Sequence, residues 1–226
     1  MAHEYVPEVA IDREGNEHPV QGWQNDYFGA KMGFWLFMFT EVMMFSAMFL
    51  ALTYYFKLHP EDYIEASSEL NRWLGGFNTV ILLISAMTMG LGLLKMRSGD
   101  VAGAKKFIWV TIIIAFMFLG VKAVEWTHEY EHGIFLLHGH LIEDGFPLGK
   151  KLFFGMYFTM TGLHGFHVLI GIGLMLWLLK RINAGKVTPE HHILHFNIAL
   201  YWDLVHLIWV FVFPYFYMIG AGHGGH

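Results

Sequence analysis

The chain has 226 residues, of which 55% are hydrophobic and only 15% are charged, whereas a soluble domain usually carries about a quarter charged residues. The formal net charge of −5 gives no indication of nucleic-acid binding. Cysteine is absent, which excludes disulfides and thiolate-bound metals.

The apolar residues fall into five long runs, and a transmembrane helix needs roughly 20 mostly apolar residues. Runs of this kind lack the alternation of barrel strands, so we expect an all-α, polytopic membrane bundle of five helices. The start of the chain is polar, and we expect no cleavable signal peptide there. The expected spans are about Gly33–Phe56, Leu74–Leu94, Phe107–Trp126, Leu152–Leu179 and Ile198–Ile219.

A polar segment that ends at Asn71 follows the first run, and we expect a loop there. The second run is rich in small residues. Its pairs Ala86-x-x-x-Gly90 and Thr88-x-x-x-Gly92 are of the kind that lets helix backbones approach closely.

Lys and Arg residues are unevenly distributed between the two ends of the spans. Nine lie on the side of the N-terminal segment and four on the other side. The positive-inside bias therefore predicts a cytoplasmic N-terminus, and an odd number of spans places the C-terminus outside. The expected organisation is a cytoplasmic segment at 1–30, a five-helix transmembrane domain at 31–220 and an external tail at 221–226.

Glu41 lies near mid-bilayer, about ten residues into the first run at 1.5 Å per residue. An ionisable group at this depth costs roughly 2.5–3.5 kcal/mol on insertion scales, and no Lys or Arg lies within one turn. We expect the carboxyl to be neutral or bonded to another helix. A contact between helices, a proton-linked site and a lipid or ligand contact all remain open.

Lys122 and Glu125 are three residues apart near the outer end of the third run. Residues at this spacing share a helix face. We expect a structural ion pair that locks the end of the helix.

Histidines and an aspartate lie deep in the last two runs. His164 and His167 share one helix face, and His206 lies at similar depth one turn after Asp203. Opposed histidines could ligate a haem, and a carboxylate could orient one of them. The alternative is an interhelical hydrogen-bond network, in which Asp203 and His206 bond to each other or to a neighbouring helix.

We therefore expect a set of buried polar residues and no catalytic residue or metal ligand. The Glu-x-x-His repeats of a bundle di-metal site do not occur on paired helices. Histidines in the loop from His128 to His140 and in the tail are expected to be solvated, with a weak metal contact as the alternative. The set comprises Lys122, Glu125, His164, His167, Asp203 and His206.

Five segments match the motifs of one known family. The runs are Phe37-Met-Phe-Thr-Glu41-Val-Met-Met-Phe45, Phe77-Asn78-Thr79-Val-Ile-Leu-Leu-Ile-Ser85, Lys122-Ala-Val-Glu125-Trp126, Thr161-Gly-Leu-His164-Gly-Phe-His167-Val168 and Tyr201-Trp-Asp203-Leu-Val-His206-Leu-Ile-Trp209. With these runs, the chain resembles subunit III of haem-copper terminal oxidases, the cytochrome c oxidase subunit III family, in its five-helix bacterial form. The last motif departs from the family, which usually has histidine first and aspartate second.

The resemblance implies an accessory, non-redox subunit of a proton-pumping oxidase in the bacterial inner membrane. Such a subunit has no catalytic centre of its own. It supports the stability and proton uptake of the catalytic subunit while electrons from cytochrome c reduce oxygen. The implied partners are oxidase subunits I and II, which would carry the haem and copper, together with phospholipids. The complex could in turn join a respiratory supercomplex.

Other functions remain open. Within the family, the chain could serve a quinol oxidase or be a homologue associated with a nitric oxide reductase. A different class is a haem b membrane anchor that uses His164, His167 and His206. A small transporter with Glu41 as its proton site is a third class, although the spans lack the internal repeat of transporter halves.

Overall fold

The computed structural model describes residues 27–131 and 147–222 and four short strands, with side chains for residues 29–131 and 147–220. The strands form two antiparallel pairs, β1 (Val9–Ile11) with β2 (Glu17–Pro19) and β3 (Ile134–Phe135) with β4 (His138–Gly139). Most of segment 1–30, the histidine side chains of the loop after His128, and the tail side chains lie outside the described residues.

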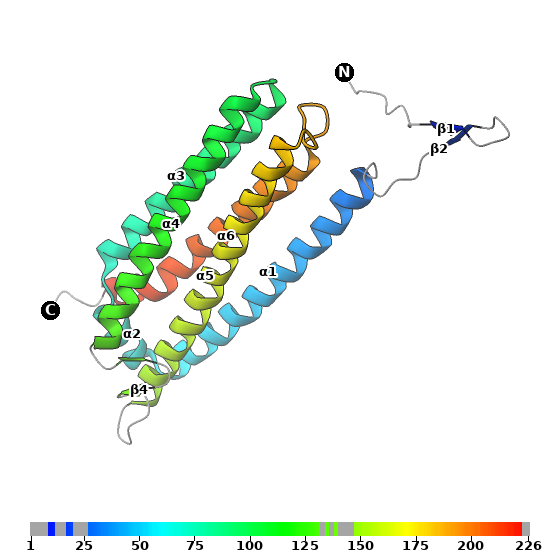
Figure 1. Ribbon diagram of the computed structural model, residues 1–226. Coiled ribbons are helices and arrows are strands. Elements are labelled where there is room, and N and C mark those ends of the chain that lie inside the picture. The colour runs from blue at the N-terminus through cyan, green and yellow to red at the C-terminus, as the bar shows by residue number, and fades with distance from the viewer. Residues whose placement is uncertain are drawn as a thin grey trace.

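Five helices are long and apolar enough to cross a membrane, which confirms the predicted all-α membrane bundle. They lie side by side, with the short helix α2 (Pro60–Glu69) at one end (Figure 1). Each helix extends a few residues beyond its predicted apolar run on at least one side. The long helices are α1 (Tyr27–Leu58), α3 (Arg72–Arg97), α4 (Val101–Glu131), α5 (Leu148–Asn183) and α6 (Ile193–Tyr217), followed by the short 3-10 helix η1 (Ile219–Gly222).

The five spans differ in how much they bury. In the most apolar stretch of α6, 56% of the residues are buried, whereas the figure for α1 is 11%. Helix α6 therefore forms the core of the bundle, with α3 and α5 packed against it, and α1 covers one edge (Figure 1).

Among the described helices, α3 and α4 make the most extensive contact. Gly99, with φ +85°, makes the turn between them, a conformation that glycine adopts without steric cost. A Cβ at Gly92 would lie 3.3 Å from Phe107, and Thr88 bonds Thr111 across the pair at 2.8 Å. The predicted Thr88/Gly92 face thus contacts a neighbouring helix, whereas Gly90 has no such neighbour within 4 Å among the described residues.

The loop predicted before Asn71 is wrong, because this segment contains α2. Pro60 occupies the first turn together with two acidic residues, which suits a helix N-terminus. Tyr63, Ala66 and Ser67 form a buried stripe with helical spacing. The segment was predicted as a loop because it is mostly polar, and the helix that it forms buries only one narrow face.

Helix α2 holds the ends of two transmembrane helices. Lys150 of α5 pairs with Glu65 at 2.7 Å and Glu69 at 3.0 Å. Ser67 donates to the carbonyl of Phe216 at 2.8 Å, while its Oγ accepts from the amide of Gly220 at 3.2 Å. These bonds satisfy backbone groups at a helix C-terminus, where carbonyls lack partners within the helix.

Replacing Ser67 with Ala leaves the Phe216 carbonyl and the Gly220 amide unpaired. We expect Ser67→Ala to destabilise the protein by about 1–2 kcal/mol, measured by thermal unfolding in detergent. Ser68→Ala is the matched control, because Ser68 is exposed and bonds only a carbonyl of its own helix. Equal stability of the two variants would show that Ser67 does not hold α6 in place.

Candidate functional site

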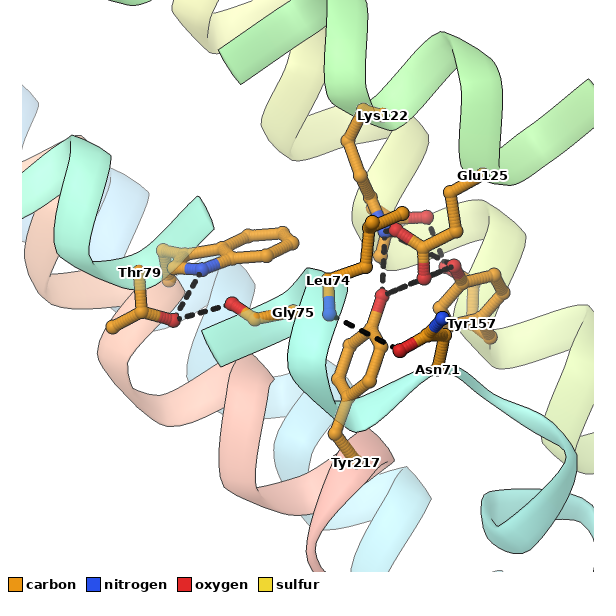
Figure 2. A network of polar contacts seen from close by, with 10 residues as sticks. Asn71, Leu74, Gly75, Thr79, Lys122, Glu125, Tyr157 and Tyr217 are labelled. Atoms are coloured by element: carbon orange, nitrogen blue, oxygen red, sulfur yellow. Dashed lines mark hydrogen bonds and ion pairs between the residues drawn. The ribbon is translucent and has the colours of Figure 1, made fainter. Parts of the chain in front are cut away.

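A buried cluster joins α4, α5 and α6 near one end of the bundle (Figure 2). Lys122 and Glu125, both on α4, form an ion pair at 3.0 Å. Lys122 Nζ also donates to Tyr157 at 3.0 Å and to Tyr217 at 2.8 Å. Both phenol groups donate to Glu125 Oε1, the Tyr157 bond measuring 2.9 Å. The ammonium thus has an acceptor for each of its three protons.

Aromatic rings complete this cluster. Lys122 Nζ lies 4.8 Å from the ring centre of Tyr157, 5.1 Å from that of Trp209 and 5.4 Å from that of Tyr217. Ring faces attract a cation, and a buried ion pair is tolerated when its remaining polar atoms are satisfied. With 8% and 3% of the two charged side chains exposed, the arrangement suits a structural lock.

Glu41 on α1 contacts His167 on α5. The Glu41 Oε2 to His167 Nε2 distance is 2.9 Å, and His167 Nδ1 lies 2.8 Å from the carbonyl of Leu163. Only 15% of the Glu41 side chain and 10% of the His167 side chain are exposed. The ring of Phe45 packs edge-on against the imidazole at 5.5 Å, and Tyr201 donates to the His167 carbonyl.

The geometry restricts the protonation of this pair. A carbonyl only accepts, so Nδ1 of His167 must carry the proton that it shares with Leu163. In neutral imidazole Nε2 is then an acceptor and needs a proton from Glu41; in the charged form Nε2 donates to the carboxylate. In both states a single proton lies between Oε2 and Nε2, and the pair as a whole is neutral.

The remaining predicted residues separate into different environments. His164 is fully buried between the rings of Phe118 at 5.7 Å and Trp209 at 5.0 Å. His206 is buried and contacts the carbonyl of Trp202 through Nδ1. Asp203 is exposed on α6 and bonds no other described residue. The predicted bond from Asp203 to His206 or to a neighbouring helix is wrong, because His206 is buried inside the bundle whereas Asp203, one turn earlier, lies on the exposed side of α6.

The six predicted polar residues therefore do not form one network. The spacing of Lys122 and Glu125 indicated their pairing, whereas no local pattern indicated Tyr157, Tyr217 or the contact between Glu41 and His167. Residues 29–131 and 147–220 contain no group of three or more His, Cys, Asp or Glu side chains that could hold a metal.

An apolar groove of about 420 Å³ runs between α1 and α6. Phe45 lines it and also contacts His167, so this ring separates the groove from the Glu41–His167 pair. Near another part of the lining, Thr53 and Tyr215 share a hydrogen bond at 3.2 Å. Further lining residues include Val42, Phe49, Leu204, Ile208 and Phe211.

Comparison with known families decides the classification. The family model described as cytochrome c oxidase subunit III matches residues 14–221. The chain belongs to this family. It is a multi-pass protein of the bacterial inner membrane and a subunit III of the haem-copper oxidases, a family without a metal centre of its own.

Relatives of this subunit III include both oxidase types. Quinol oxidase subunit 3 of Bacillus spizizenii is 28% identical over 84% of this chain and 87% of its own length. Cytochrome bo(3) ubiquinol oxidase subunit 3 of Pseudomonas aeruginosa is 29% identical over 84% of each chain. Cytochrome c oxidase subunit 3 of Thermostichus vulcanus is 27% identical over 93% of each chain.

Replacing Lys122 with Met leaves the buried Glu125 carboxylate without its cation. Breaking a buried pair from one side costs about 3–5 kcal/mol, so we expect a large fall in Tm. The double variant Lys122→Met/Glu125→Gln removes both charges and should recover most of the loss.

Lys95→Met is the control for the loss of a lysine. Lys95 pairs with Asp100 at the surface, where 48% and 44% of the two side chains are exposed, and such pairs contribute less than about 1 kcal/mol. If Lys122→Met were as stable as Lys95→Met, the buried cluster would not be a structural lock.

Proposed function

We propose that this subunit III is the accessory, non-redox subunit of a proton-pumping haem-copper oxidase. In this role it supports the stability and proton uptake of the catalytic subunit during oxygen reduction. The observation that carries the proton-linked part is the 2.9 Å contact between Glu41 and His167. Two titratable side chains at bilayer depth share one proton there, on different helices.

Several further assignments belong to the same proposal. The partners are oxidase subunits I and II, which hold the haem and copper, and the complex could join a respiratory supercomplex. Residues 1–30 form a cytoplasmic segment, 31–220 the membrane domain and 221–226 an external tail. The apolar groove between α1 and α6 suits the acyl chain of a phospholipid.

We propose cytochrome c as the electron donor, with a quinol as the alternative. The relatives described above include both oxidase types at similar identity, so the donor is a matter for the purification experiment below.

The proton-sharing pair explains how the site could act. Losing the shared proton would bring a carboxylate against the bare lone pair of Nε2, 2.9 Å away. Proton release therefore requires α1 and α5 to separate locally, or a new proton to arrive. A change in the packing of α1 would thus alter proton exchange at Glu41.

Glu41→Gln tests this role in the assembled complex. The Gln amide can donate to Nε2 of His167, so we expect normal assembly. Without an exchangeable carboxyl proton, we expect turnover to fall, or inactivation to accelerate, most strongly at high pH where protons are scarce. Oxygen consumption as a function of pH, with proton stoichiometry, measures both effects.

Glu61→Gln is the matched control, because Glu61 is exposed in the first turn of α2. Wild-type turnover, pH dependence and lifetime in Glu41→Gln would refute the proton-linked role and assign Glu41 to helix contact alone. The accessory role would survive that result, because it depends on assembly.

Purification of the native complex through a tag on this chain tests the partners and the electron donor. We expect a haem-containing subunit and a copper-containing subunit II to copurify, and the complex to oxidise reduced cytochrome c. Oxidation of quinol without a copper-containing subunit would assign the chain to a quinol oxidase. A monodisperse monomer with its own haem spectrum would contradict the accessory role.

A further inference from the structure

Three neighbouring helices contribute buried polar side chains that have no partner. Asn78 on α3 and His164 on α5 are fully buried, and His206 on α6 is 4% exposed. Both amide atoms of Asn78, both ring nitrogens of His164 and Nε2 of His206 lack a hydrogen bond among the described residues. None of these atoms is used by the Glu41–His167 pair or the Lys122–Glu125 cluster.

Two indole hydrogen bonds bring these side chains to one level of the bundle. Trp202 of α6 donates to Ser85 of α3 at 3.0 Å, and Trp209 donates to Thr79 at 3.1 Å. His206 lies between the two tryptophans on α6, and its ring comes within reach of the Leu82 backbone on α3. Its Nε2 nevertheless makes no hydrogen bond of normal geometry to any described residue. Asn78 precedes Thr79 on the buried face of α3.

His164 approaches the same place from α5. Its ring packs against Trp209 at 5.0 Å, and it is close enough to His206 for the two rings to interact electrostatically. The neighbouring polar groups Thr79, Ser85, Trp202 and Trp209 are all hydrogen-bonded. A cluster of unpaired atoms beside well-bonded neighbours is unusual, because more than about 90% of buried polar groups have a partner.

The chemistry of the atoms defines the ligand. Since Nδ1 of His206 donates to a carbonyl, its Nε2 is an acceptor, whereas Asn78 offers both a donor and an acceptor. Neutral His164 likewise offers one donor and one acceptor. A ligand that both donates and accepts satisfies this mixture. A metal ion is disfavoured because the Lys122 cation also acts on His164 and Glu125 is occupied by Lys122 and two tyrosines.

We propose that Asn78, His164 and His206 form an internal water site in the middle of the bundle, bridged by one or more ordered water molecules. A buried water typically makes about three hydrogen bonds, which matches a site supplied by three helices. Trp209 contacts both Lys122 and His164. The proposed water site therefore lies between the Lys122–Glu125 cluster and the Trp202–Ser85 hydrogen bond.

A structure of the purified oxidase complex at a resolution that shows ordered water tests the proposal directly. We expect density within hydrogen-bonding distance of at least two of the three side chains. A dry contact, direct hydrogen bonds among the three side chains, or a bound metal ion would each overturn it.

Thermal unfolding of variants gives an independent test, because a dry site and a water-filled site predict changes in Tm of opposite sign. If the site were dry, His164→Phe would remove two unpaired polar atoms and raise Tm. If water bridges the site, the Phe ring displaces it, leaves Asn78 and His206 unpaired, and lowers Tm by several degrees. Adding Asn78→Leu should then recover part of the loss, whereas additive effects of the two substitutions would count against a shared water.

Trp126→Phe is the control, because the indole nitrogen of Trp126 is also unpaired and buried but lies outside this group. Trp126→Phe should leave the proposed water in place, because Trp126 is not part of the site. The change in Tm caused by Asn78→Leu should therefore be the same with or without Trp126→Phe. Coupling of Asn78 to Trp126 as strong as that to His164 would overturn the site.

Discussion

The Lys122–Glu125 ion pair is the interaction around which one end of the bundle is organised. Both charges come from α4, but the groups that make them tolerable in the interior come from α5 and α6. Hydrocarbon offers no hydrogen bonds, so a polar group in a membrane bundle must find its partners on its own helix, on another helix or in buried water. The cluster therefore determines which faces of α4, α5 and α6 meet.

The same constraint organises the other polar groups. Along α3 and α6, hydroxyl groups pair with indoles. At the edge of the bundle, Glu41 and His167 satisfy each other by sharing a proton. These three polar systems differ in chemistry. The Lys122–Glu125 cluster is a charged pair, the hydroxyl–indole bonds join neutral groups, and Glu41 and His167 share a proton. The proposed proton-linked role rests on the last of these, because its carboxyl and imidazole are the groups that take up or release a proton near physiological pH.

The lengths of the apolar runs were sufficient to predict the five spans, because lipid selects for length and hydrophobicity alone. They could not predict α2, whose polar composition resembles a loop and whose buried stripe is short. The spacing of Lys122 and Glu125 indicated their pairing, since both lie on one helix. Tyr157, Tyr217 and the Glu41–His167 contact depend on the packing of distant helices, which no local spacing specifies. The predicted bond between Asp203 and His206 failed for a related reason: two residues one turn apart can lie on either side of the boundary between the buried and the exposed face of a helix.

Helix α1 has a further consequence for biogenesis. Of the five described spans it leaves the ribosome before the other four, yet His167, the partner of Glu41, lies 126 residues later, and the partner of Thr53 lies 162 residues later. Until α5 and α6 enter the membrane, Glu41 has neither partner nor neighbour from these helices. Helix α1 can therefore complete its polar contacts only after the other four described spans have been made, and until then a neutral Glu41 carboxyl costs less to keep in lipid than a charged one.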